Sequence, residues 1–349
     1  MKKLLFFLLP FVGLAQIPEY YEGIDFNDRA ELQTELSDLI TATHTNSLRY
    51  TPGVWDVLKQ SDLVPSDSTK VLLIYGFDDT DAEQKNDRTR GIGSTNNGGC
   101  GSCIGRWERE HVFPQSLANP RMSTSSPGTG TDAHNLRAVD RQMNSSRSNR
   151  AYVDYSGNAT IVGADFYPGD EWIGDVARIM MYMKVRYNDA QTQVCDPNLL
   201  ASNSTNVSSP DMPDLFLKWN ALDPPSEYEL IRNEVIYEKQ GNRNPFIDNP
   251  YLATLTWGGQ TAQNSWTELS TNQYQIEEIK IEVSPNPATD VVNIIAKQFK
   301  SANLYSIEGI LLQTNLKDKF SIAQYPSGVY ILAITLENGK IVTKKVIKK

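Results

Sequence analysis

The polar stretch that begins at residue 258, GGQTAQNSWTELSTNQYQ, divides the chain into two segments with different hydrophobic patterns. It has neither helical nor strand periodicity, which is typical of a linker. Before it, apolar residues recur mainly at helical spacing, and after it they alternate with polar residues as in strands. We therefore expect an α+β protein with a mainly helical domain at residues 16–257, a linker at 258–277 and a small all-β sandwich at 278–349.

The first domain carries three clear helical patterns and one strand pattern. Apolar residues share one face at 30–44 and at 171–187, and the second of these stripes, rich in methionine, is typical of a buried core. A capping box at Ser226–Glu229 begins a third helix, and Gly241 ends it. The apolar run VLLIYGF at 71–77 predicts a short buried strand.

The first fifteen residues, MKKLLFFLLPFVGLA, have the layout of a secretory signal peptide: a Lys-Lys start, a short apolar run and small residues before Gln16. No later apolar stretch reaches the length of a transmembrane helix. We therefore expect an exported protein without a stable membrane span, secreted or held at the outer cell surface.

An exported chain meets oxidising conditions, and this affects how the three cysteines are interpreted. Cys100 and Cys103 form a CxxC pair, and Cys195 stands alone. A disulfide between Cys100 and Cys103, or from one of them to Cys195, is favoured. A zinc site is disfavoured because no second CxxC or HxxxH follows, and no partner marks a cysteine nucleophile.

The formal net charge of −9 argues against a polyanionic partner, but the charge is unevenly distributed. The segment 104–150 contains no lysine and is rich in arginine, whose planar fork matches a phosphate with two hydrogen bonds. A solvated arginine-rich loop is the simpler alternative. The seven residues are Arg106, Arg109, Arg121, Arg137, Arg141, Arg147 and Arg150.

Glu110 and His111 stand side by side in GRWEREHVFPQS, in a chain with only three histidines. Downstream, DAHNL predicts a strand carrying His134, and AVDRQMNSSR predicts a helix carrying Asn144. A strand with His111, a second strand and this helix would make a compact ββα unit. Adjacent strand residues face opposite sides, so Glu110 and His111 can converge only at a strand end or bulge, and Pro114 favours a strand end.

REHVFPQS followed by DAHNLRAVDRQMNSSRSN closely resembles the endonuclease I family of secreted bacterial nucleases, which belongs to the ββα-metal, or His-Me finger, group. Flanking segments such as YTPGVWDVLK and SEYELIRNEVIYEKQGNRNPFIDNP extend the resemblance over roughly residues 18–257. It implies hydrolysis of nucleic-acid phosphodiester bonds with one divalent cation, giving 5′-phosphate products. It also implies that His111 is the general base and that Glu110 and Asn144 are metal ligands.

The chemistry of these residue types agrees with those roles. A histidine is neutral near pH 7 without a large pKa shift, as a general base must be. Carboxylate and amide oxygens are hard ligands, and a sparse set of them suits Mg²⁺, with Mn²⁺ or Ca²⁺ as alternatives.

Six further residues around the motif receive less specific predictions. Three arginines are candidates for contacting the scissile phosphate: Arg109, Arg137 and Arg147. His134 either fixes the second strand through a hydrogen bond or contributes directly to the site. Asn135 is expected to hold the turn rather than bind metal, and Asn149 to cap the helix C-terminus.

The C-terminal segment resembles the type A sorting domain of the type IX secretion system. The resemblance rests on VSPNPATDVVNI, LYSIEGILL, PSGVYILAI and the terminal TKKVIKK, and Asn338-Gly339 predicts a hairpin turn. It implies recognition by that secretion machinery, export across the outer membrane, and then release or surface attachment. A generic β-sandwich binding domain is the alternative.

These features predict a secreted, Mg²⁺-dependent endonuclease of low sequence specificity that acts as a monomer on DNA, with RNA as a second candidate substrate. Two other functions remain open from sequence. One is a catalytically inactive surface protein that binds nucleic acid or glycan, and the other is a phosphodiesterase acting on small molecules.

Overall fold

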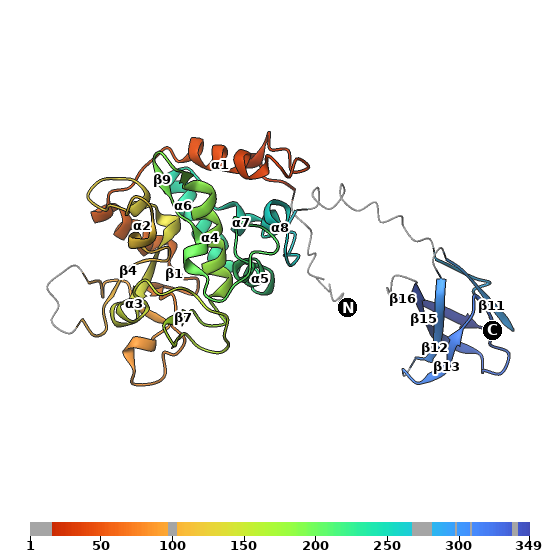
Figure 1. Ribbon diagram of the computed structural model, residues 1–349. Coiled ribbons are helices and arrows are strands. Elements are labelled where there is room, and N and C mark those ends of the chain that lie inside the picture. Colours follow the sequence, from red (N-terminus) through yellow and green to blue (C-terminus); the bar gives the residue numbers. More distant parts are fainter. Residues whose placement is uncertain (1–15, 97–102, 267–280, 297–298, 308, 337–340) are drawn as a thin grey trace, which may run out of the picture. The chain divides into compact units, whose positions relative to one another are not determined.

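The chain folds into two compact units, residues 1–271 and 272–349 (Figure 1). The computed structural model describes residues 16–96, 103–266, 281–296, 299–307, 309–336 and 341–349. The predicted signal peptide lies outside these residues. The first unit mixes helices with short strands and the second is all β, as the hydrophobic patterns predict.

The helices of the first unit pack around α4, in which every residue from Ile173 to Val185 is buried. The methionine-rich stripe therefore belongs to the core, as predicted. The buried face of the first helix carries Leu32, Leu36 and Ile40, which also confirms the pattern at 30–44. The helices are α1 Leu32–Thr43, α2 Trp55–Ser61, α3 Arg141–Arg147, α4 Ile173–Arg186, α5 Asp214–Leu222, α6 Glu227–Gln240, α7 Pro245–Asp248 and α8 Tyr251–Trp257.

Helix α6 has the predicted ends. The Ser226 side chain accepts a hydrogen bond from the Glu229 backbone N–H, and the Glu229 carboxylate accepts one from the Ser226 N–H. Gly241 follows the helix with φ of +90°, a conformation that glycine adopts without steric cost.

The strands of the first unit form small antiparallel sheets. The strand expected over 71–77 begins earlier and ends at Leu72, and the next three residues are buried in irregular backbone. The pairs are β1 Leu63–Val64 with β2 Asp67–Leu72, β2 with β3 Thr89–Gly91, β4 Trp107–His111 with β5 Leu136–Asp140, β6 Thr160–Val162 with β7 Asp165–Tyr167, and β8 Asn188–Asp189 with β9 Gln193–Val194.

The predicted start of the linker at residue 258 is wrong, because the chain continues to pack on the first unit as far as Trp266. That indole is 2% exposed and lies 4.9 Å from the ring of Tyr21 and 5.7 Å from the ring of Phe26, measured between centroids. The preceding N–H, that of Ser265, donates to the Asn249 side chain. One aromatic residue in a polar stretch thus anchors the segment, and residues 267–277 of the expected linker lie outside the described residues.

Replacing Trp266 with alanine should lower the free energy of unfolding of the first unit by about 3–5 kcal/mol, because a buried indole is lost and a cavity remains. Urea denaturation followed by circular dichroism measures this. Leu222→Ala is the control, since that side chain is 54% exposed and its removal should cost about 0.5 kcal/mol or less. Equal midpoints for the two variants would mean that residues 258–266 do not stabilise the unit.

The second unit consists of two antiparallel sheets that share one apolar core. Along β11, Val292 and Ile294 point inward while their neighbours are more exposed, which is the alternation expected of a sandwich. The predicted Asn338-Gly339 turn lies outside the described residues, between paired strands. One sheet has β10 Glu282–Ser284, β11 Val291–Ile295 and β14 Lys319–Ser321, and the other has β12 Phe299–Ser306, β13 Leu311–Leu316, β15 Gly328–Leu336 and β16 Ile341–Lys348.

Within the described part of the chain, no helix combines the length and the apolar character that crossing a membrane requires.

Candidate active site

The predicted motif folds as two antiparallel strands followed by a helix. Strand β4 pairs with β5 so that Glu110 lies opposite Arg137, and α3 begins directly after β5. The Asp140 carboxylate caps α3 by accepting from two backbone N–H groups of the first turn. His134 is not on the second strand as predicted, because it lies in a 3₁₀ turn, Ala133–Asn135, that precedes β5.

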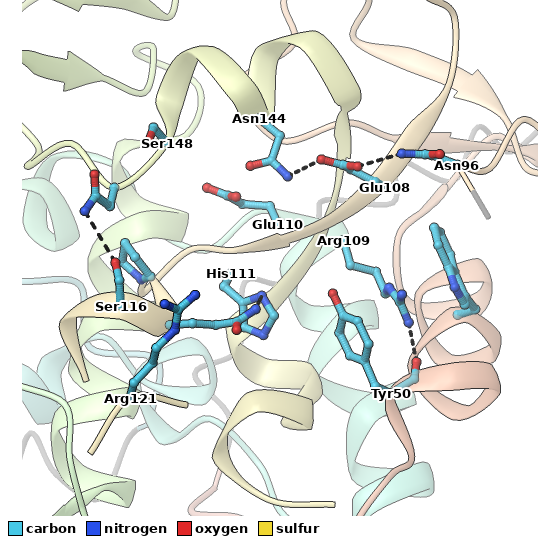
Figure 2. Close-up of a pocket in the computed structure, with 14 residues that line it drawn as sticks. Tyr50, Asn96, Glu108, Arg109, Glu110, His111, Ser116, Arg121, Asn144 and Ser148 are labelled. Atoms are coloured by element: carbon cyan, nitrogen blue, oxygen red, sulfur yellow. Dashed lines mark hydrogen bonds between the residues drawn. The ribbon is translucent and has the colours of Figure 1, made fainter. Parts of the chain in front are cut away.

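Glu110 and His111 reach one pocket from opposite faces of β4. The pocket has a volume of about 520 Å³ and is lined by all four residues from Glu108 to His111. Figure 2 shows the two carboxylates on the side of α3, and Arg109 and His111 on the side of Tyr50. His111 is the last residue of β4, and at this strand end both side chains line one pocket, as expected.

The hydrogen bonds of His111 define which ring nitrogen can act as a base. Its Nε2 lies 2.8 Å from the carbonyl oxygen of Gly130, which can only accept, so Nε2 carries the proton. Nδ1 therefore has a lone pair, toward which Gln115 donates from 3.1 Å. Burial lowers the pKa of His111 to about 4, against the opposing effect of the Gly130 bond, so the ring is neutral at pH 7.

Glu110 is a buried carboxylate, only 3% exposed, at the base of the pocket. Burial raises its pKa to about 7, while the charge of Arg147 and a hydrogen bond from Tyr75 oppose the rise. The Arg147 Nε lies 3.4 Å from the Glu110 carboxylate and the Tyr75 hydroxyl 3.1 Å. Because desolvation outweighs these contacts, the site favours a further positive charge beside the carboxylate.

Asn144 enters the pocket from α3. Its Nδ2 donates to the Glu108 carboxylate over 2.5 Å, and its amide oxygen accepts no hydrogen bond from the residues that the structure describes. In Figure 2 this oxygen is turned away from Glu108, on the side of Glu110. Glu108 was not singled out from the sequence, although its i, i+2 spacing from Glu110 on one strand face could have revealed it.

Two of the three arginines proposed to contact phosphate are instead buried in the fold, so that prediction is wrong for them. Arg137 is 1% exposed and donates to Asp175 over 2.6 Å. Arg147 is fully buried and donates to the Val112 carbonyl over 2.7 Å. Neither guanidinium lines the pocket. Arg137 is held by the buried Asp175 carboxylate, and Arg147 by the buried Val112 carbonyl.

Arg109 and Arg121 are the arginines that line the pocket. The guanidinium of Arg109 lies 3.4 Å from the centroid of the Tyr50 ring and 4.3 Å from that of Trp55, which holds it in place. Arg121 is exposed and forms no ion pair with any described residue. The sequence identified Arg121 only as a member of the arginine-rich segment. It lies in an irregular loop, where no periodic pattern predicts which way its side chain points.

His134 and Asn135 support the site from behind. His134 is buried, packs on the Tyr182 ring, and has its Nε2 3.1 Å from the Asn242 carbonyl. These contacts favour a structural role over a direct contribution to the site. The Asn135 side chain accepts from the Phe113 N–H and donates to the Phe113 carbonyl. It thus holds the chain just after His111, in agreement with its predicted structural role.

Asn149 does not cap α3, contrary to the prediction. The residue that ends the helix is Ser148, whose N–H donates to the Asn144 carbonyl, and its φ of +54° turns the chain. Asn149 lies one residue further on, lines the pocket and donates to Ser116.

The structure decides one of the cysteine alternatives. Cys195 is a free, buried thiol whose pKa is raised by burial, which excludes its pairing and disfavours its use as a nucleophile. Cys103 is disulfide-bonded. The proposed pairing with Cys100 falls on a residue outside the described part of the chain.

The donors at the pocket fit a hydrated cation better than a fully protein-bound one. Among the described residues, no three His, Cys, Asp or Glu side chains cluster so as to hold a metal. Of the oxygen donors that line the pocket, the Glu110 carboxylate and the Asn144 amide oxygen are the two assigned to a cation, because the Glu108 carboxylate already accepts from the Asn144 amide. Mg²⁺ commonly binds to one or two protein oxygens and retains several waters, so this donor set fits it.

Comparison with known proteins defines the class as secreted nucleases. Residues 29–251 match the model of the family described as Endonuclease I, and residues 282–349 match the secretion system C-terminal sorting domain. The chain therefore belongs to the endonuclease I family and carries a type IX sorting domain at its C-terminus.

Two curated relatives are extracellular ribonucleases. The protein of Bacillus amyloliquefaciens is 36% identical over 253 residues, covering 70% of this chain and 79% of the relative. That of Bacillus subtilis (strain 168) is 36% identical over 258 residues, covering 71% and 81%. A shorter match, 36% identical over 70 residues, is to beta-agarase D of Zobellia galactanivorans and covers 20% of this chain and 15% of the relative.

Family and sorting domain together describe a nuclease that is secreted or held at the cell surface. Its substrate is nucleic acid, and the type IX machinery is its partner in export.

Proposed function

We propose that the protein is a metal-dependent endonuclease that hydrolyses phosphodiester bonds of DNA and RNA with low sequence specificity. The observation that carries this proposal is one pocket lined by a neutral His111, whose Nδ1 lone pair accepts, among the described residues, only from the Gln115 amide, and by the oxygens of Glu110 and Asn144. This combination offers a base and a binding site for a cation, as phosphodiester hydrolysis requires.

In the proposed mechanism, His111 takes a proton from the attacking water at Nδ1. The Gly130 carbonyl holds the ring in the required tautomer and orientation throughout, because it can accept only from Nε2–H. The Gln115 amide occupies the Nδ1 position in the free protein and would yield it to the water. The protonated ring then gives its proton back to solvent.

Glu110 and Asn144 would hold the divalent cation through one carboxylate and one amide oxygen. When bound, Mg²⁺ would screen the charge that develops on the phosphate and on the leaving oxygen. The family resemblance implies that the P–O3′ bond breaks and that the leaving 3′-oxygen takes up a proton from solvent to become a hydroxyl, giving 5′-phosphate ends.

Arg121 is the group best placed to meet the substrate backbone. It is an exposed cation at the pocket without an ion pair in the described residues, whereas Arg109 is held by two aromatic rings and a backbone carbonyl. Contacts from arginine to phosphate position the backbone without reading bases, and this supports low specificity. The ribonuclease names of the relatives support RNA as a substrate beside DNA.

Digestion of supercoiled plasmid and of a structured RNA, each with Mg²⁺ and with EDTA, tests the proposal on the mature protein. Cleavage of either polymer that stops with EDTA supports it. A protein that binds both polymers without cutting would instead be an inactive binding protein. Hydrolysis of a chromogenic diester, with both polymers left intact, would point to a small-molecule phosphodiesterase.

The proposed ligand role of Glu110 predicts how cleavage depends on pH. Its folded pKa of about 7 is above the ordinary value, so the carboxylate is protonated and lost as a ligand when the pH falls below about 7. His111, with a pKa of about 4, stays neutral over that range and does not limit the rate. At Mg²⁺ concentrations that do not saturate the site, cleavage should therefore fall on acidification with a midpoint near pH 7.

Cation and proton compete for the same carboxylate, so raising Mg²⁺ about tenfold should move this midpoint to lower pH by up to about one unit. Initial rates measured across pH 4–9 at two Mg²⁺ concentrations check both statements. A midpoint near 4 that ignores Mg²⁺ would assign the limiting group to His111 and contradict the role of Glu110.

Arg121→Ala should raise the KM for DNA and reduce the salt dependence, because one phosphate contact and its released counterion are lost. In a plot of log kcat/KM against log salt concentration, the slope should become shallower by about one unit. The change should be the same for substrates of different sequence. Arg88→Ala, which removes a half-buried arginine that pairs with Glu171 outside the pocket, is the control. An unchanged slope in Arg121→Ala would remove Arg121 from the substrate interface.

A further inference from the structure

The orientation of the Asn144 amide determines whether that residue can bind a cation. An asparagine side chain presents either an oxygen, which accepts, or an NH₂ group, which donates. A rotation of 180° about its last bond exchanges the two and would turn donor hydrogens toward the metal. Something in the site must therefore select the orientation with the oxygen toward Glu110.

Glu108 is in contact with the nitrogen side of this amide. Its Oε1 accepts from Asn144 Nδ2 over 2.5 Å, and its Oε2 accepts from Asn96 Nδ2 over 2.9 Å and is 3.1 Å from Arg141 Nε. All three neighbours donate. The carboxylate is 19% exposed at its side chain and has no hydrogen to give, so only the NH₂ group of Asn144 can face it.

We infer that Glu108 is a positioning residue that fixes the Asn144 amide with its oxygen toward the cation. The inference rests on the proposed function, in which Asn144 is a metal ligand. Strand alternation places Glu108 and Glu110 on the same face of β4, so one strand supplies both a ligand and the group that orients the other ligand. Partners of this kind typically change metal affinity by a factor of 10–100 when they are removed.

The hydrogen-bond pattern predicts that Glu108→Gln weakens metal binding by more than the loss of one negative charge would. If the new amide turned its oxygen to Asn144, its NH₂ group would face the donors of Asn96 and Arg141. If it turned its oxygen to those two donors, its NH₂ group would face Asn144 and favour the inverted amide. The second arrangement satisfies more hydrogen bonds, so this substitution selects the wrong orientation of the ligand.

Three explanations for an effect of Glu108 predict different orders of metal affinity. Orientation predicts that Glu108→Gln binds metal more weakly than Glu108→Ala, because alanine leaves the Asn144 amide free to turn. A through-space effect of charge predicts equal losses, because both substitutions remove one negative charge. A packing role predicts the reverse order, because glutamine preserves the volume of the side chain and alanine does not.

Mn²⁺ binding to the mature full-length protein, followed by electron paramagnetic resonance of the free ion, measures the affinity without relying on catalysis. We expect Glu108→Gln to raise the Kd for Mn²⁺ by a factor of about 10–100, and Glu108→Ala to raise it by less. In an Asn144→Ala background, Glu108→Gln should have little further effect, because the ligand that it misorients is gone. Glu171→Gln, which alters an arginine-paired carboxylate outside the pocket, should bind as the wild type does.

The outcomes separate this inference from the proposed function. If Asn144→Ala binds Mn²⁺ as tightly as the wild type, Asn144 is not a ligand and the proposed metal site fails. If Asn144→Ala loses affinity but Glu108→Gln does not, or if Glu108→Gln has the same effect in both backgrounds, only the positioning role is overturned. Thermal unfolding in EDTA identifies a variant that does not fold. If Glu108→Ala does not fold, the effect of Glu108→Gln in the wild-type and Asn144→Ala proteins still tests the positioning role.

Discussion

Replacing His111 with alanine is expected to lower the rate of nucleic-acid cleavage by a factor of about 10²–10⁴, the contribution typical of a positioned general base. The physical reason is specific to Nδ1. The Gly130 carbonyl holds the proton on Nε2, and burial keeps the ring neutral at pH 7, so the lone pair is available at every pH where the enzyme is folded and active. The described pocket lining offers no second imidazole to replace it.

Initial rates at saturating Mg²⁺ measure the effect on kcat, and the Kd for Mn²⁺ should stay close to the wild-type value because His111 is not a proposed ligand. Added imidazole should restore part of the rate by entering the space left by the side chain. A His111→Ala variant that cleaves as fast as the wild type would place the base elsewhere. Thermal unfolding identifies a variant that does not fold, since removing the buried ring leaves the Gly130 carbonyl without its donor and should cost about 1–3 kcal/mol.

The position of His111 could be predicted because the relevant information is local. Its neighbours in the sequence, Glu110 before it and Pro114 shortly after it, indicate a strand end at which adjacent side chains can meet. The helix bearing Asn144 could be predicted for the same reason, since α3 matches a continuous stretch of residues with helical propensity.

The roles of the arginines could not be predicted because they depend on contacts distant in sequence. Arg137 is withdrawn from the pocket by Asp175 on α4, and Arg147 lies behind β4 between Glu110 and Tyr152. Residue type and spacing in the sequence do not distinguish these two arginines from Arg121. Only the tertiary fold separates an arginine that compensates a buried acid from one that is exposed to substrate.

Trp266 illustrates the same limit at the domain boundary. Composition and periodicity are averages over a window, and a single buried indole in a polar segment does not alter them enough to move the predicted linker. The partners that bury it, Tyr21 and Phe26, are at the other end of the unit in sequence. A pattern read along the chain detects regular elements, whereas a segment held by one anchor residue becomes visible only in three dimensions.

Replacing Asn144 with alanine is expected to weaken the binding of Mg²⁺ or Mn²⁺ by at least about a hundredfold and to abolish cleavage at about 1 mM Mg²⁺. Groups that merely orient a ligand already contribute a factor of 10–100, so losing one of only two protein oxygens should cost no less. Removing the cation from the wild type with EDTA should have the same effect on cleavage, since Glu110 and Asn144 have no other proposed task in the reaction.

The dependence on metal concentration distinguishes this defect from that of His111→Ala. Raising Mg²⁺ should restore part of the activity of Asn144→Ala, because the Glu110 carboxylate remains, whereas His111→Ala should not respond. Gln142→Ala, on the same helix but outside the pocket, is the matched control and should behave as the wild type. If Asn144→Ala binds Mn²⁺ normally yet does not cleave, then Asn144 acts on the substrate rather than on the cation, and Glu110 would be the sole protein ligand.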